Sequence, residues 1–178
     1  YESLFREARE AAKKAIALNP NLSDGHRSLA HVYNNDGSGR IADAAREAQQ
    51  ALTLNPNDAE AWYLLAQTYT YYDTRDLDRA QIYYENAIQL NPDYAMAYNS
   101  LGWFVYLEKK WYDKAVEAFE RAIQISPNFT EAYDSLGEAY FRMGKYPEAA
   151  RNFRKALELQ PSHKHAARRL KEAEKAPR

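Results

Sequence analysis

Histidine and carboxylate side chains are the residues of this sequence that could bind a metal ion or transfer protons. The four histidines are His26, His31, His163 and His165. His163 and His165 lie two residues apart, which places their rings on different sides of a helix, and no third ligand follows at a fixed spacing. The chain has no cysteine, which excludes thiolate metal sites and cysteine nucleophiles. The sequence therefore predicts no metal site and no cofactor.

The sequence also lacks the common motifs of catalysis and phosphate binding. It has no G-x-S-x-G motif and no glycine-rich phosphate loop, and its carboxylates are spread over segments that read as surface helices and turns. Residues 34–39 (NNDGSG) have the composition of a phosphate or Ca²⁺ loop, but neither the lysine nor the glutamate of those loops follows at the required distance. We interpret this segment as a turn and expect the chain not to be an enzyme.

The segments that must position these residues repeat along the chain. Five of the seven prolines are spaced at intervals of 36, 36, 35 and 34 residues, at Pro20, Pro56, Pro92, Pro127 and Pro161. Each ends a similar phrase, such as Leu54-Asn55-Pro56. The residue before a proline is disfavoured in a helix, so each phrase is expected to end one.

Two helical patterns flank each proline phrase. Before it, pairs of alanines lie seven residues apart, and a position between them that is bulky in the later repeats would fill the space between helices. The pairs are Ala44 and Ala51, Ala80 and Ala87, Ala115 and Ala122, and Ala149 and Ala156; the positions between are Ala48, Tyr84, Phe119 and Phe153. After it, apolar residues follow at i, i+3, i+4 and i+7, one face of a helix, as in Trp62, Leu65, Ala66 and Tyr69. Each period is therefore predicted to form a first helix, a turn, a second helix and a proline loop, in that order.

With these residues in view, the chain resembles the tetratricopeptide repeat (TPR) family. Two segments match the family pattern W-x2-L-G-x2-Y: Trp62-x2-Leu65-Ala66-x2-Tyr69 and Tyr133-x2-Leu136-Gly137-x2-Tyr140. The alanine positions match the second half of the family repeat. The resemblance implies an all-α fold, a right-handed α-solenoid of stacked antiparallel helix hairpins that forms a superhelix.

The repeats predict a single TPR domain over residues 1–178. It comprises a half repeat with only its second helix (1–20), four full repeats (23–56, 59–92, 95–127 and 130–161) and a capping helix (164–176) with a polar outer face. The distance from the last position of the first helix to the first alanine is 9 residues in the final repeat but 11, 11 and 10 in the others. We expect every extra residue to lie in the turn within the hairpin.

The resemblance also implies a peptide-binding groove lined by the first helices. In TPR proteins the second, fifth, ninth and twelfth residues of these helices usually contact the ligand. The predicted peptide-binding residues are Arg27, His31, Asn34, Tyr63, Gln67, Tyr71, Met96, Asn99, Trp103, Tyr106, Asp134, Glu138 and Phe141; Asp24, Glu60, Thr70 and Glu131 share the spacing. Trp103 and Tyr106 would be apolar anchors and Gln67 and Asn99 would bind the peptide backbone. Any one of the aromatic side chains could instead pack between adjacent first helices.

Charge is unevenly distributed and bears on the partner. Residues 19–140 contain 9 Lys and Arg against 18 Asp and Glu, whereas residues 141–178 contain 11 against 4. An acidic body disfavours an RNA-binding helical repeat, so we expect a protein or peptide partner and no nucleic acid. The acidic group Glu131, Asp134 and Glu138 should favour Lys or Arg at the end of the peptide nearest the final repeat.

Two further expectations concern assembly and location. The half repeat presents Leu4, Phe5, Ala8 and Ala12, which predicts a homo-oligomer through the N-terminal edge as an alternative function. No run of about 18 apolar residues occurs, so no membrane partner and a cytoplasmic location are expected. The chain begins at Tyr1 rather than Met, which suggests a fragment of a larger protein from which a targeting segment could be missing.

Overall fold

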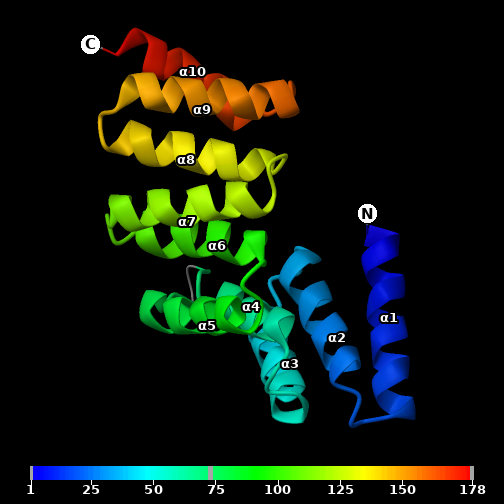
Figure 1. The fold of residues 1–178 in the computed structure, drawn as a ribbon. Coiled ribbons are helices and arrows are strands. Elements are labelled where there is room, and N and C mark those ends of the chain that lie inside the picture. Colours follow the sequence, from blue (N-terminus) through cyan, green and yellow to red (C-terminus); the bar gives the residue numbers. More distant parts are fainter. Residues whose placement is uncertain (1, 72–73, 177–178) are drawn as a thin grey trace. The chain divides into compact units, whose positions relative to one another are not determined.

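The computed structural model describes residues 2–71 and 74–176, and within these ranges the chain is all helical, without a strand. The predicted fold class is therefore confirmed, and the capping helix is ordered. The elements are α1 (Glu2–Leu18), α2 (Ser23–Asn35), α3 (Ile41–Leu54), α4 (Ala59–Thr68), α5 (Leu77–Leu90), α6 (Ala95–Leu101), the π-helical segment η2 (Gly102–Tyr106), α7 (Tyr112–Ile125), α8 (Thr130–Arg142), α9 (Tyr146–Leu159) and α10 (Lys164–Lys175) (Figure 1). None of the helices described is long and apolar enough to cross a bilayer.

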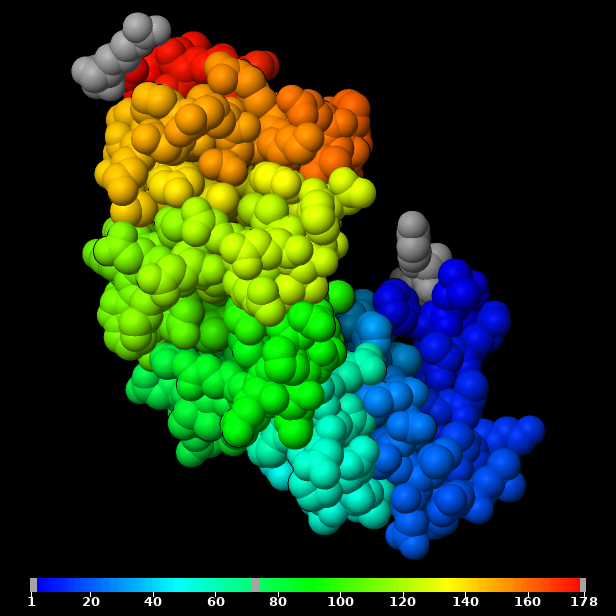
Figure 2. All heavy atoms as spheres, in the orientation of Figure 1, coloured from blue at the N-terminus to red at the C-terminus, as the bar shows by residue number. Residues whose placement is uncertain are grey.

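The chain forms two compact units that meet in the sequence at the third proline phrase. Unit 1 is Tyr1–Pro92 with α1 to α5, and unit 2 is Asp93–Arg178 with α6 to α10. Within each unit every helix packs against the next one in the chain, and the first helices of successive hairpins also touch, α2 with α4 and α6 with α8. The helices of unit 2 form a closely packed stack from α6 (green) to α10 (red) (Figure 2).

Four of the five proline phrases end a helix in the same way. The residue before the proline is in or close to the extended region, and its N–H donates to the carbonyl of the alanine four residues earlier. These residues are Asn55, Asn91, Ser126 and Gln160, with N···O distances of 2.8, 2.9, 2.9 and 2.9 Å. The prediction that the proline phrases end the second helices is confirmed for α3, α5, α7 and α9.

Small residues allow the helices of each hairpin to approach closely. Phe119 and Phe153, from α7 and α9, are fully buried and lie against a glycine of the preceding first helix. A Cβ atom on Gly102 would lie 2.6 Å from the Phe119 ring, and one on Gly137 would lie 2.7 Å from the Phe153 ring. An alanine at either position would therefore force the buried ring to shift, because its methyl group would overlap the ring.

The first helix of the third hairpin contains a π-turn. The amide of Leu107 donates to the carbonyl of Gly102 at 2.9 Å, a bond to the fifth rather than the fourth preceding residue. Downstream, Trp111 N donates to Tyr106 O at 2.8 Å across a turn in which Lys110 has a φ of 59°. The helix thus accommodates one more residue before the turn.

The fourth hairpin shows where this extra residue lies. Its turn is closed by the same bond, from Lys145 N to Tyr140 O at 2.9 Å. Tyr140 follows Gly137 by three residues, whereas Tyr106 follows Gly102 by four. The expectation that all extra residues lie in turns is therefore wrong for this repeat: the inserted residue is inside the helix, between Gly102 and Tyr106.

Candidate functional site

Arg27 ties α2 to the start of α4 in unit 1. Its guanidinium lies 3.1 Å from Asp58, 3.4 Å from Glu60 and 3.2 Å from Asp24. Asp58 also caps α4 by accepting a hydrogen bond from Ala61 N at 3.0 Å. Arg27 and Glu60 are two of the side chains placed at ligand positions by the sequence, and here they pair with each other. His31, one turn further along α2, is exposed.

Four other predicted side chains of unit 1 bind one another or the neighbouring backbone. Asn34 Nδ2 donates to Leu64 O at 3.1 Å and approaches Gln67 Oε1 at 3.5 Å, and Gln67 Nε2 donates to Tyr63 OH at 3.0 Å. Tyr71 OH donates to Asn34 O at 3.1 Å. Asn34 and Tyr63 are buried, whereas Gln67 is half-buried and Tyr71 is 40% exposed. This network holds α2 against α4 and leaves Gln67 and Tyr71 accessible.

In unit 2 the predicted residues of α6 and η2 form a more apolar surface. Met96 is 49% exposed, while Asn99 and Trp103 are half-buried. Asn99 Oδ1 has no hydrogen-bond partner within the described residues. The Trp103 ring packs on the core cluster that includes Leu136, and its centroid lies 6.0 Å from that of His165 in α10, edge to face. We call the surface of Met96, Asn99 and Trp103 the first-helix face of unit 2.

The π-turn places Tyr106 beside α7. Its ring centroid lies 6.1 Å from that of Trp111, and Lys114 Nζ lies 5.9 Å from the Tyr106 centroid. Tyr106 corresponds to Tyr140 of the next hairpin, which also packs between its two helices. The structure therefore does not bring Tyr106 together with Met96 and Asn99 on the first-helix face.

The acidic group of α8 lies largely beneath the capping helix α10. Asp134 is 2.8 Å from His165 Nδ1, and Glu138 accepts hydrogen bonds from Arg169 Nε at 2.7 Å and Nη2 at 2.6 Å. Arg142 Nε adds a bond of 2.8 Å to Glu138, which is only 1% exposed. Two of the three carboxylates expected to attract a basic peptide are thus already bound to cationic or imidazole groups of this chain.

The remaining members of this group are arranged around the same helix. Phe141 lies under the Arg169 guanidinium, 4.4 Å from ring centroid to Cζ, and Glu131 is exposed. Burial lowers the pKa of Arg169, but its hydrogen bonds to Glu138 and Glu172 outweigh burial and raise the pKa above its usual value. The ion pair therefore persists over the whole range in which the carboxylates are ionised.

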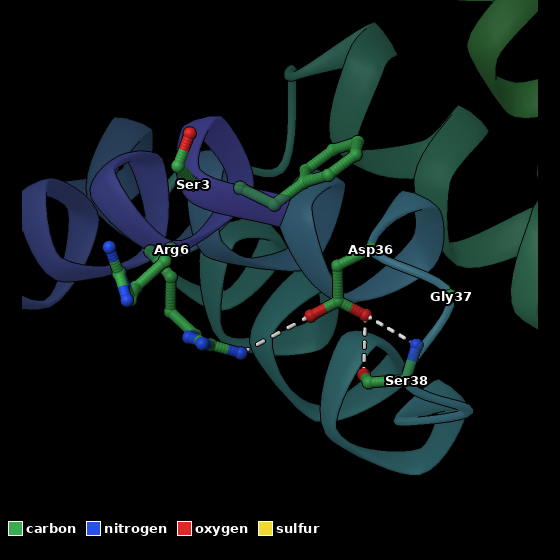
Figure 3. A pocket seen from close by; sticks show the side chains of 7 residues that line it. Ser3, Arg6, Asp36, Gly37 and Ser38 are labelled. Atoms are coloured by element: carbon green, nitrogen blue, oxygen red, sulfur yellow. Dashed lines mark hydrogen bonds and ion pairs between the residues drawn. The ribbon is translucent and has the colours of Figure 1, made fainter. Parts of the chain in front are cut away.

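A separate concavity of about 570 Å³ lies between the start of α1 and the turn after α2 (Figure 3). Asp36 accepts hydrogen bonds there from the N–H and Oγ of Ser38 and pairs with Arg9 at 3.4 Å; Arg6 is exposed at its mouth. Burial raises the pKa of Asp36, but the hydrogen bonds from Ser38 and the positive charge of Arg9 outweigh it, so the pKa lies below its usual value. These contacts tie α1 to the turn.

Models of the tetratricopeptide repeat match residues 47–82, 83–117 and 130–163, and a TPR repeat model matches residues 105–144. The chain belongs to the tetratricopeptide repeat family. No curated protein matches this TPR chain.

Solved structures share the fold. MamA, whose crystal structure has been solved, is 35% identical in sequence to this chain. The match covers 88% of this chain and 89% of the MamA chain, with a TM-score of 0.72. TTC0263, a thermophilic TPR protein of Thermus thermophilus, is 24% identical over 95% of this chain and 90% of its own, with a TM-score of 0.79. YrrB, described as a TPR protein with an unusual peptide-binding site, is 20% identical over 95% of this chain and 84% of its own, with a TM-score of 0.71. The last two support the fold alone.

Two exposed aromatic residues of this TPR protein, Phe104 and Trp111, were not among the predicted site residues. Phe104, within the π-turn, is 38% exposed and follows Trp103 directly. The signal was the count of ten rather than nine residues between Val105 and Ala115, but that count does not reveal whether the insertion lies in the turn or the helix. Among the described residues, no group of three or more His, Cys, Asp or Glu is arranged to hold a metal ion.

Proposed function

We propose that this TPR protein is an interaction scaffold that binds a peptide segment on the first-helix face of unit 2. The observation that carries the proposal is the combination of an exposed Met96, a half-buried Trp103 and an Asn99 acceptor without a partner among the described residues, all on the continuous helix of α6 and η2. Met96, Asn99 and Trp103 follow one another at i, i+3 and i+7, which places them on one side of the helix.

The chemistry of this face suits a peptide. Trp103 offers a large contact area at a small cost in side-chain entropy, and an amide can both donate to and accept from a peptide backbone. A buried polar atom without a partner is uncommon in native proteins, so Asn99 Oδ1 is well placed to gain a bond when the side chain rearranges around a ligand. Since Asp134 and Glu138 are already paired, recognition here depends on shape and hydrogen bonds, with exposed Glu131 as the remaining acidic contact.

Replacing Trp103 by Ala tests the proposal. A partner recovered by pull-down is reduced to a binding peptide, and its affinity is measured by titration calorimetry. We expect Trp103→Ala to weaken binding by about 2 kcal/mol, roughly thirtyfold in dissociation constant, with an unchanged circular dichroism spectrum. Trp111→Ala is the matched control, because Trp111 is also a partly exposed tryptophan but lies beside α7. If the Trp103→Ala and Asn99→Ala proteins bound the peptide as tightly as the parent protein, the peptide would not bind on the first-helix face of unit 2.

A contact between two copies is a second candidate, favoured by exposed leucines on α1. Leu4 and Leu18 are 67% and 79% exposed, whereas Ala12 on the same helix is buried in the core. In a dilute monomeric sample we expect the α1 amides to exchange with solvent faster than those of α5, because fewer groups cover α1. Hydrogen exchange followed by mass spectrometry measures this. Equal protection of α1 and α5 in a sample that sediments as a monomer would remove the reason for this candidate.

A further inference from the structure

A second concavity, of about 700 Å³, lies in unit 1 beside the end of α2. Tyr33 and Tyr71 supply aromatic lining, and Ile41 and Ala42 line it from the first turn of α3. Thr74 contributes from the segment that follows α4. The cavity is therefore built from the ends of two successive hairpins and falls within the size range of ligand-binding pockets.

This cavity arises from two insertions in the sequence. Tyr33 and Ala44, and likewise Tyr69 and Ala80, are 11 residues apart, two more than the matching pair in the fourth repeat. In the fourth hairpin the turn is closed by a bond from Lys145 N to the carbonyl five residues earlier. In the second hairpin the corresponding bond runs from Asp76 N to Tyr69 O, seven residues earlier, at 2.9 Å. The lengthened turns thus supply walls that the fourth repeat lacks.

Among the described residues that line the cavity, the polar groups are uncharged and include the unsatisfied acceptor of Asn34. No Asp, Glu, Lys or Arg is among the described residues that line it. Arg40 lies nearby, with its guanidinium 4.0 Å from the Tyr33 centroid, but it is paired with Asp43 at 2.7 Å. Asn34 lines the cavity and is 7% exposed, and its Oδ1 has no hydrogen-bond partner within the described residues.

We propose that this cavity binds a tryptophan or tyrosine side chain of the peptide partner, whose ring packs between Tyr33, Tyr71 and Ile41 while its N–H or O–H donates to Asn34. A charged side chain is disfavoured because none of the described lining residues carries a charge that would compensate its desolvation. Aromatic side chains satisfy both requirements, since they combine a large apolar surface with one donor group. This inference rests on the proposed function, because it gives the peptide scaffold a selective pocket in unit 1.

N-acetyl-tryptophanamide and N-acetyl-tyrosinamide are suitable probes, because each presents the side chain without a peptide. They are titrated into the full chain and followed by amide chemical shifts in nuclear magnetic resonance spectra. We expect saturable shifts at Gly37, Gly39 and Thr74, with a dissociation constant on the order of 1 mM. N-acetyl-glutamic acid amide is the charged probe and should cause none. Absence of saturable shifts at these residues with either aromatic probe would overturn the proposal.

Two variants on α3 give the matched comparison. Ala42→Phe fills the cavity from an exposed position, so the fold is retained, and it should weaken binding of the aromatic probes about tenfold. Gln50→Phe adds the same side chain two helical turns further on, outside the lining, and should leave binding unchanged. Unchanged probe binding by Ala42→Phe would also overturn the proposal. Because the shifted residues and both variants lie in unit 1, that failure is distinguishable from a negative result with Trp103→Ala in unit 2.

Discussion

Phe153→Ala is expected to reduce the free energy of unfolding of unit 2 by about 4 kcal/mol, the range for an aromatic residue deleted from a packed core. Phe153 is fully buried in α9, in a cluster with Ala149, Ala156 and Ala166. Its ring lies directly against Gly137, where even a Cβ atom would be only 2.7 Å away. The buried alanines of the cluster cannot extend into the vacated space, and the larger side chains packed against it, such as Tyr140 and Leu170, can fill only the part that they reach.

Hydrogen exchange resolved by segment is the appropriate measurement, since repeat proteins can unfold in parts and a single midpoint would conceal this. Protection should fall in α8, α9 and α10 and remain in α2 and α3, because each repeat is stabilised mainly by its neighbours. Ile82→Ala is the control: Ile82 is 54% exposed on α5, and the change should cost less than about 0.5 kcal/mol. Unaltered protection of α8 to α10 in Phe153→Ala would contradict the prediction.

The features fixed by local sequence were predictable. A proline restricts the residue before it whatever the tertiary structure, so Asn55, Asn91, Ser126 and Gln160 end their helices as expected. The alanine positions likewise follow from helical spacing alone. Whether residues 1–178 act as one domain, as the continuous repeat predicts, is a separate matter; the boundary between the two units falls at one of these proline phrases.

The position of the inserted residue in the third repeat was not predictable from spacing. A longer turn and a π-turn both satisfy the count of ten residues, and solvated turns are usually the easier place for an insertion. The structure separates them because the contact of Gly102 with Phe119 fixes the register before the insertion. The bond from Trp111 N to Tyr106 O fixes it after. Only a three-dimensional contact could show that Tyr106 lies away from the first-helix face of unit 2 while Phe104 is exposed.

The pairing of α8 with α10 shows a second limit. Positions along a repeat indicate which side of a helix a residue occupies, but not whether another helix covers it. Asp134 and Glu138 meet His165 and Arg169, each 31 residues further along the chain. The contrast between an acidic body and a basic tail is visible in the sequence, but charge counts alone do not show that carboxylates of the body and cations of the tail are in contact. Peptide binding by the thirteen predicted residues stays a prediction.

Glu138→Ala should destabilise the packing of α10 on α8 by about 3 kcal/mol, the lower end of the range for breaking a buried ion pair. The carboxylate is 1% exposed and accepts both Arg169 bonds, while the Arg169 side chain is 23% exposed. Removing the carboxylate leaves that guanidinium partly buried without its main partner. Arg142, at 34% exposure, can turn toward solvent and contributes less to the cost.

Two further variants separate the ion pair from simple loss of packing. Glu172→Ala removes the other carboxylate bound to Arg169, but Glu172 is 44% exposed, so solvent screens this pair and its loss should cost much less than the loss of Glu138. The double variant Glu138→Leu with Arg169→Met replaces the pair by apolar side chains and should recover most of the lost stability, because the desolvated charge is gone. Exchange rates of the α10 amides report all three. The explanation would be wrong if Glu138→Ala and Glu172→Ala lost equal stability, or if the double variant recovered none. Either result would show that Glu138 does not stabilise α10 by compensating the buried charge of Arg169.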